Sequence, residues 1–259
     1  MKSHDSLVAS AESLRALHVP GDPVVLPNAW DAASARVLAE AGFAALATSS
    51  GAVARALGYE DGHKTPPDEM FGAIARITRA VDLPVTADIE RGYDLEPKEI
   101  VERLVDAGAV GCNLEDSDPL SKELIDLDEQ AEWLRDIRSA ASDAAVPIVV
   151  NARVDVHLRK WGDEGSRLET AVERGMRYLE AGADCVYPIF LNDPAEVKSF
   201  VDGVRGNVNV VFLPGSTRAG LASTGVARIS LGSGLHDASM QWLKGAAAKL
   251  AAGDDPYKG

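Results

Sequence analysis

Short apolar runs alternate with longer amphipathic stretches along the whole chain. The apolar runs are rich in β-branched residues and lack a strict apolar–polar alternation, which is typical of parallel strands buried on both faces. They predict strands at residues 24–26, 44–49, 85–89, 111–115, 148–152, 185–189, 208–213 and 227–231. The stretches between them predict helices at residues 31–41, 66–81, 97–107, 128–142, 167–181, 194–204, 218–223 and 238–252.

A short repeat marks the joints between predicted helices and strands. An acidic residue, alanine and glycine end three helices at positions 40–42, 106–108 and 180–182, and residues 223–225 form a weaker fourth copy. Glycine after a helix adopts a left-handed conformation without a Cβ clash and lets the chain turn into the next strand. The repeat therefore indicates one continuous βα series.

Eight βα units in 259 residues have the size and order of a (β/α)8 TIM barrel. A doubly wound open sheet has the same alternation, but the count of eight and the lack of a Gly-x-Gly-x-x-Gly sequence favour the barrel. No linker-like segment divides the chain, so we expect a single domain over residues 1–259. Residues 1–21 would form an N-terminal lead-in and residues 254–259 a polar tail.

Charge and cysteine content narrow the function classes. Forty acidic and 26 basic residues give a net charge of −14, which disfavours binding to nucleic acid or to an anionic membrane. Cys112 and Cys185 lie in strand-like runs and are expected to be buried free thiols. Residues 1–10 lack the pattern of a signal peptide. We therefore expect a cytoplasmic enzyme with a small-molecule substrate.

Acidic side chains gather where two neighbouring predicted strands end. Asp88 and Glu90 alternate along one strand end and so face the same side, and Glu115 follows the next strand. Barrel enzymes place their active sites at these carboxyl ends. Crowded carboxylates repel one another unless a cation or a proton lies among them, and oxygen ligands suit Mg²⁺ or Mn²⁺. The alternative is that these acids cap helices or pair with Arg91 and Arg153.

Groups that could bind an anionic substrate follow other strands. Arg153 could bind a carboxylate or phosphate through two parallel hydrogen bonds, or form a structural ion pair with a nearby acid. Residues 49–51 (Ser-Ser-Gly) are expected to form a turn that offers hydroxyl and backbone N–H donors. Trp30, after the first strand, could form a wall of the pocket.

Four motifs, in order, resemble the isocitrate lyase/phosphoenolpyruvate mutase superfamily. Residues 48–51 with 58–61 resemble its second-strand segment, and residues 88–93 resemble its Asp-x-Asp-x-Gly-Tyr metal segment, with Glu90 for the second aspartate. Residues 114–116 resemble its fourth-strand metal glutamate, and residues 151–155 its substrate-clamping strand. The resemblance covers residues 24–250 and implies a TIM barrel of the phosphoenolpyruvate/pyruvate type.

The resemblance implies a role for each matching residue. Asp88 would be the main Mg²⁺ ligand, with Glu115, Glu90 and Asp61 ligating the metal or holding its water molecules. Ser50, Gly51 and Ala52 would bind the substrate carboxylate or enolate oxygen, together with Arg153. Arg153, Ser50 and Asp61 would be the catalytic groups. The implied activity is Mg²⁺-dependent cleavage of a C–C bond, by decarboxylation or an aldol-type reaction, in a small 2-oxo or 2-hydroxy dicarboxylic acid through a metal-stabilised enolate.

Two departures from the superfamily pattern limit the substrate. Residues 116–124 lack the Lys-Lys-Cys-Gly-His loop of isocitrate and methylisocitrate lyases, whose cysteine is the proton donor. Ile189 stands where the methylisocitrate lyases carry a glutamate. Both changes favour a small 2-oxo acid, such as oxaloacetate or a related diacid, over a tricarboxylate.

Other functions and the assembly stay open at this point. The alternatives are P–C chemistry of the phosphoenolpyruvate mutase or phosphonopyruvate hydrolase type, which Ser216 and Ser233 could support by binding phosphate, or non-catalytic binding of a 2-oxo acid. The polar segment 117–126 is expected to close over the substrate. The resemblance also implies a homo-oligomer, a dimer or tetramer, in which exchange of the C-terminal helix is absent or reduced.

Overall fold

A computed structural model describes residues 2–258 of the chain. Residues 1 and 259, the outermost residues of the predicted lead-in, tail and domain, lie outside the described residues. All strand pairs are parallel. The strands are β1 (Val24–Leu26), β2 (Asn28–Ala29), β3 (Leu46–Thr48), β4 (Val85–Asp88), β5 (Gly111–Leu114), β6 (Val149–Val154), β7 (Cys185–Pro188), β8 (Asn209–Val211) and β9 (Arg228–Ser230).

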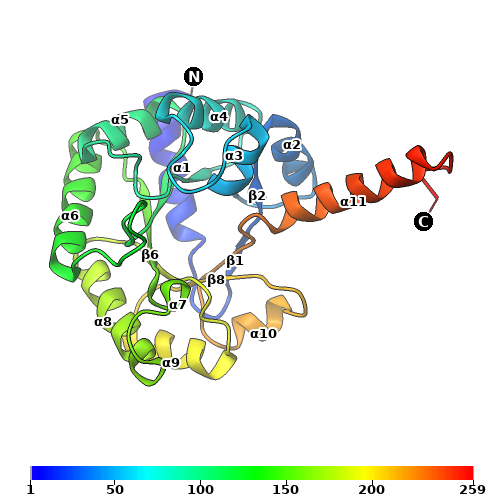
Figure 1. The fold of residues 1–259 in the computed structure, drawn as a ribbon. Coiled ribbons are helices and arrows are strands. Elements are labelled where there is room, and N and C mark those ends of the chain that lie inside the picture. The colour runs from blue at the N-terminus through cyan, green and yellow to red at the C-terminus, as the bar shows by residue number, and fades with distance from the viewer. Residues whose placement is uncertain (1, 259) are drawn as a thin grey trace.

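These strands close into the predicted barrel. Strands β2 to β7 pair in chain order, and β1, β9 and β8 form a second set. Only Pro27 separates β1 from β2, so the two are one strand interrupted where proline lacks an N–H group. A parallel bridge between Val186 and Val208 joins β7 to β8. The barrel of eight strands is therefore continuous, and the fold-class prediction is confirmed (Figure 1).

Helices surround the barrel, as Figure 1 shows. They are α1 (His4–Ala16), α2 (Ala32–Glu40), α3 (Ser50–Leu57), α4 (Pro67–Arg79), α5 (Pro97–Asp106), α6 (Leu127–Asp143), α7 (Val156–Arg159), α8 (Arg167–Glu180), α9 (Pro194–Val204), α10 (Arg218–Ala222) and α11 (Gly234–Ala251), with a 3-10 turn at Glu164–Ser166. Apart from α1, α10 and α11, these helices pack their apolar faces on the outer surface of the strands and complete one core.

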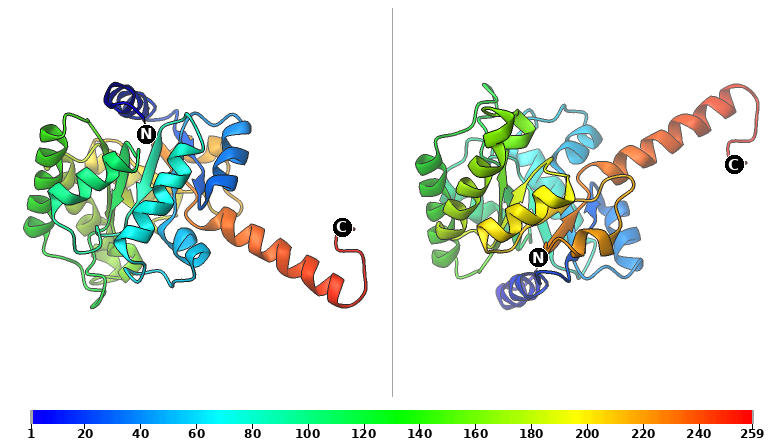
Figure 2. Two further views of the ribbon diagram at one scale, coloured as in Figure 1. Left: turned by 90° about the horizontal axis from the view of Figure 1, so that it is seen from above. Right: turned by 90° about the horizontal axis from the view of Figure 1, so that it is seen from below.

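The two terminal helices are placed differently from the rest. Helix α1, the predicted lead-in, lies across one end of the barrel (Figure 2), where Leu14 is fully buried. Helix α11 projects away from the barrel, and His236 is its only buried residue. Within residues 2–258, no helix is long and apolar enough to span a membrane.

The element bounds agree with the prediction to within a few residues, with three corrections. Residues 50–57 form the helix α3, so the sequence Ser49-Ser50-Gly51 is a helix N-terminus capped by Ser49 and not a turn. Residues 156–159 form the short helix α7, which the pattern did not predict. Helix α11 begins at Gly234, four residues before the predicted start.

Candidate active site

The predicted site residues lie at the carboxyl ends of the barrel strands. Asp88 is the last residue of β4, Glu115 directly follows β5, and Arg153 lies near the end of β6. In the ladder, Asp88 is paired with Asn113 and Arg153 with Tyr187. Adjacent parallel strands therefore bring these side chains to one end of the barrel.

Asp88 is held by the start of helix α3. Its Oδ2 atom accepts hydrogen bonds from the backbone N–H and the hydroxyl of Ser50, both at 2.9 Å, and its own N–H donates to Thr48 Oγ1. Burial raises the pKa of Asp88, while the two bonds from Ser50 and the charge of Arg153 oppose that rise. Asp88 Oδ1 is buried and accepts no hydrogen bond from the described residues. Oδ2 of this carboxylate is thus held by Ser50, and Oδ1 is available to bind a ligand such as a cation.

Glu90 is buried beside Asp88 in a left-handed backbone conformation. It accepts hydrogen bonds from the backbone N–H of His63 at 2.6 Å and from the hydroxyl of Tyr93 at 3.2 Å. Burial, followed by the charges of Asp61 and Asp88, raises the pKa of Glu90 to about 7. Tyr93 ends the sequence motif that contains Glu90, and its contact with Glu90 is not evident from the motif alone.

Arg153 is shared by two carboxylates. Its guanidinium forms an ion pair with Glu115 and donates to both oxygens of Asp155, at 2.6 and 2.9 Å. Burial would lower the pKa of Arg153, but Asp155 and Glu115 outweigh burial and raise it well above its usual value. The ion-pair alternative considered for Arg153 is therefore realised, and its partner Asp155 is a residue to which the sequence assigned no role.

Asp61 reaches the start of helix α3 from the loop after it. A Cβ atom built on Gly51 would lie 2.7 Å from Asp61 Oδ2 and 3.4 Å from Arg55 Nη1. Only glycine allows this close approach. The charge of Asp61 contributes to the raised pKa of both Asp88 and Glu90, as expected for three acids that lie near one another.

The two other predicted substrate-binding residues, Ala52 and Trp30, lie in different parts of the structure. Ala52 is buried in the first turn of α3, and its N–H donates to the capping hydroxyl of Ser49. Trp30 packs edge-to-face on His236, with ring centroids 5.3 Å apart, and lines a groove between α2 and α11. The structure thus places Trp30 at the base of the C-terminal helix.

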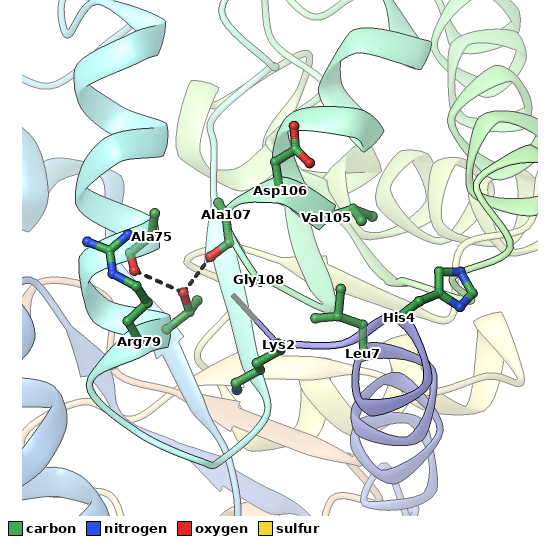
Figure 3. Close-up of a pocket in the computed structure, with 10 residues that line it drawn as sticks. Lys2, His4, Leu7, Ala75, Arg79, Val105, Asp106, Ala107 and Gly108 are labelled. Carbon is green, nitrogen blue, oxygen red and sulfur yellow. Dashed lines mark hydrogen bonds between the residues drawn. The ribbon is translucent and has the colours of Figure 1, made fainter.

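A separate cavity of about 220 Å³ lies between α1, α4 and α5, lined in part by Lys2, Leu7 and Thr78 (Figure 3). It adjoins the C-terminal ends of α4 and α5, where each helix turns into the start of the next strand. This cavity is therefore at the end of the barrel opposite the carboxylates.

The carboxylates of the site are suited to a divalent metal that is bound directly by one of them, Asp88. No three His, Cys, Asp or Glu side chains in residues 2–258 converge as a ready-made metal cluster. Arg153 contacts Glu115, and His63 with Tyr93 contacts Glu90, so the role of Asp88, Glu90 and Glu115 as metal ligands stays a prediction. Proteins commonly bind Mg²⁺ through one or two carboxylates, with water and substrate supplying the other oxygens. The free Oδ1 of Asp88 suits that arrangement.

Comparison with known proteins is consistent with this geometry. The family model described as phosphoenolpyruvate phosphomutase matches residues 14–251. An uncharacterized protein of Mycobacterium tuberculosis is 34% identical over 93% of this chain and 90% of its own. A protein of Corynebacterium glutamicum, named provisionally as a 2-methylisocitrate lyase, is 32% identical over 83% of this chain and 70% of its own.

A solved structure extends the similarity to three dimensions. A protein of Burkholderia cenocepacia, named provisionally as a phosphonomutase, is 41% identical and has a TM-score of 0.86, over 91% of this chain and 97% of its own. The predicted enzyme class and the predicted superfamily are both confirmed. The chain belongs to the phosphoenolpyruvate phosphomutase family, within the isocitrate lyase/phosphoenolpyruvate mutase superfamily.

Proposed function

We propose that this chain is a Mg²⁺-dependent lyase, with Mn²⁺ as a possible substitute, that cleaves a C–C bond of a small 2-oxo or 2-hydroxy dicarboxylic acid. The observation that carries the proposal is the Asp88 carboxylate, fixed through Oδ2 by Ser50 while its buried Oδ1 is free of partners among the described residues. The lyase name of the Corynebacterium relative supports the reaction class.

The metal would be held by Asp88 directly, and by Glu90, Glu115 and Asp61 through water. A bound divalent cation would withdraw charge from the oxygens next to the bond that breaks. Ser50 keeps the Asp88 carboxylate in one orientation through two hydrogen bonds. In this proposal Ser50 therefore positions the metal ligand, and the backbone N–H of Gly51 faces the substrate carboxylate, because the N–H of Ala52 is already donated to the Ser49 hydroxyl.

Arg153 would bind the substrate carboxylate or its C2 oxygen. The guanidinium is already oriented by Glu115 and Asp155, so it loses little conformational freedom when substrate binds. In a 2-oxo acid, the electron pair of the breaking C–C bond passes through C2 to the carbonyl oxygen and forms an enolate, whose negative charge the Arg153 guanidinium would stabilise. The departing fragment is carbon dioxide in a decarboxylation or a carbonyl compound in an aldol-type cleavage.

The charge balance of the site favours a small substrate. Arg153 already faces two carboxylates, and Arg159 donates to Ser117 at 3.0 Å and lies 3.8 Å from Asp155. Each further substrate carboxylate would need another cation, because burying an unpaired charge is costly. We therefore favour oxaloacetate or a related diacid over a tricarboxylate.

P–C chemistry on phosphonopyruvate is the second candidate. The provisional name of the Burkholderia relative favours it, and so does one contact of the site. The hydroxyl of Ser233, after β9, lies 3.0 Å from that of Ser49 at the start of α3. This pair of hydroxyls could bind a phosphonate oxygen.

The test is an assay with Mg²⁺ on oxaloacetate, 2-methylisocitrate and phosphonopyruvate that follows the release of pyruvate and, for phosphonopyruvate, also the formation of phosphoenolpyruvate. The change Asp88→Asn keeps the size of the side chain but removes its charge. We expect it to lower kcat/KM by roughly a hundredfold or more, because the cation then lacks its direct ligand. The exposed Asp82, at the start of the turn before β4, provides the matched control Asp82→Asn, which should leave the rate unchanged.

The assay also separates the alternatives. Because free Mg²⁺ alone promotes oxaloacetate decarboxylation, the rate with Asp88→Asn protein is the baseline. Turnover of phosphonopyruvate alone would assign the chain to P–C chemistry. Mg²⁺-dependent binding of oxalate in calorimetry without turnover of any substrate would instead indicate a binding protein, and equal rates for wild type and Asp88→Asn would refute the proposed metal site.

A further inference from the structure

A buried polar cluster joins Asp116, which follows β5 and Glu115, to Arg174 and Tyr178 of helix α8. The carboxylate of Asp116, the residue after Glu115, is fully buried. Its Oδ2 atom accepts hydrogen bonds from Arg174 Nε at 2.7 Å and from the Tyr178 hydroxyl at 2.8 Å. Arg174 and Tyr178 are one helical turn apart and are themselves buried.

Arg174 also binds the far end of the loop that begins at Asp116. Its Nη2 atom donates to the carbonyl oxygen of Ile125 at 2.6 Å, and the backbone N–H of Ile125 donates to the carbonyl of Asp116 at 2.9 Å. Ser117 and Leu124 pair just above, as an isolated antiparallel bridge. One guanidinium therefore ties together both ends of segment 117–124, which we call the site loop.

Asp116 is also linked to Arg153 through Asp155. Its Oδ1 atom accepts the backbone N–H of Asp155 at 2.8 Å. The Asp155 carboxylate in turn binds the Arg153 guanidinium, and it also accepts the hydroxyl of Ser117 at 2.6 Å. A chain of direct contacts thus runs from α8 through Asp116 and Asp155 to the cation of the site.

We propose that Arg174 is a positioning residue that fixes the closed base of the site loop and, through Asp116 and Asp155, the orientation of Arg153. The planar guanidinium suits this role, because it donates in two directions at once, which an ammonium group on a flexible stem does less well. The ligand-binding part of the test rests on the proposed function. The effect of Arg174 on the site loop does not depend on any substrate.

The same helix provides a matched control. Arg177, three residues along α8, pairs with the exposed Asp128 at 2.7 Å. Arg177→Met removes the same charge from the same helix without touching the buried cluster. A general effect of losing an arginine from α8 would therefore appear in both variants.

The test compares hydrogen exchange and ligand binding in Arg174→Met, Arg174→Lys, Tyr178→Phe and Arg177→Met proteins. In Arg174→Met we expect site-loop amides to exchange about tenfold faster, with amides 111–114 of β5 unchanged. We expect Mg²⁺-dependent oxalate binding, measured by calorimetry, to weaken by about tenfold. Arg174→Lys should recover part of both losses, Tyr178→Phe should show a smaller change in the same direction, and Arg177→Met should match wild type.

Each result has a definite meaning. Unchanged loop exchange in folded Arg174→Met protein would overturn the inference, and so would equal acceleration in the loop and in β5. If Arg174→Met does not fold, unchanged loop exchange and unchanged oxalate affinity in Tyr178→Phe protein would overturn it. If wild type binds no oxalate, the proposed function fails, while the exchange data still test the role of Arg174 in the loop.

Discussion

At the scale of single residues, the site depends on how each carboxylate is satisfied. Ser50 holds one oxygen of Asp88, Arg153 holds Glu115, and Glu90 receives neutral donors. Buried carboxylates stay ionised only where charge or hydrogen bonds offset the cost of desolvation. The unsatisfied oxygen of Asp88 is therefore the feature that most needs a ligand.

Histidine 18 determines part of the pH dependence of stability. His18 is buried after α1; its ring Nδ1 lies 2.8 Å from the Leu14 carbonyl and donates to it. Burial, aided by the charge of Arg228, lowers the pKa of His18 to about 4. The unfolded chain takes up this proton near its ordinary pKa of about 6.5. The stabilisation is thus complete above that pH and is lost as the pH falls towards 4.

The expected loss is about 3 kcal/mol between these two pH values. Urea unfolding of wild type and His18→Gln at pH 7.5 and 4.5 would measure it, since the other titrating groups contribute equally to both proteins. The variant should lose less stability on acidification. An equal loss in the two proteins would show that His18 has no part in it.

At the scale of elements, helix α1 closes the end of the barrel opposite the site. A Cβ atom built on Gly111 would lie 2.9 Å from Thr86 Oγ1 and 3.0 Å from Leu14 Cδ2, so the helix approaches β5 as closely as glycine allows. Arg15 anchors the helix by a 2.8 Å contact with Asp184 and by bonds to the carbonyls before β6. Helix α1 is thus part of the barrel core.

Leu14→Ala should therefore destabilise the whole fold. The side chain is fully buried, and its loss leaves a cavity between α1 and the barrel. We expect the free energy of unfolding to fall by about 2–5 kcal/mol. Chemical denaturation measures this change, and Leu120→Ala, at a position 88% exposed, should change it by less than about 0.5 kcal/mol. Similar values for both variants would mean that α1 is not part of the cooperative unit.

At the scale of the whole molecule, helix α11 leaves an apolar surface uncovered. Met240, Trp242, Leu243 and Leu250 are exposed along it. A groove of about 630 Å³ at its base is lined largely by apolar side chains, which include Val37 of α2, Trp242 of α11 and Trp30 just before α2. Large exposed apolar patches commonly mark association sites. We propose that a second copy of this chain covers this surface in the homo-oligomer that the superfamily resemblance implies.

Trp242→Asp should reduce the assembly to monomers. The introduced charge would be buried without a partner in the association we propose. Light scattering after gel filtration at micromolar concentration gives the mass, and Gln241→Asp, an exposed polar position on the same helix, is the control. A monomeric wild type, or an unchanged mass for Trp242→Asp, would contradict the proposal.

The sequence by itself determined the barrel and the location of the site. Parallel strands buried on both faces appear in the sequence as apolar runs, and glycine is needed where helices turn into strands. The local sequence pattern therefore indicates both the strands and the joints between helices and strands. The carboxyl ends of such strands must meet, which is why Asp88, Glu115 and Arg153 could be expected together. Helix α3 was missed because Ser-Ser-Gly sequences are as common in turns as at helix starts.

Only the tertiary structure decided which group binds which. The Ser50 donors point at Asp88, Glu115 is occupied by Arg153, and Asp155 is the second partner of that cation. The role of Arg174 depends on contacts with residues 58 and 49 positions away along the chain. Such pairings follow from how helices and loops pack around the barrel, and no periodicity in the sequence records them.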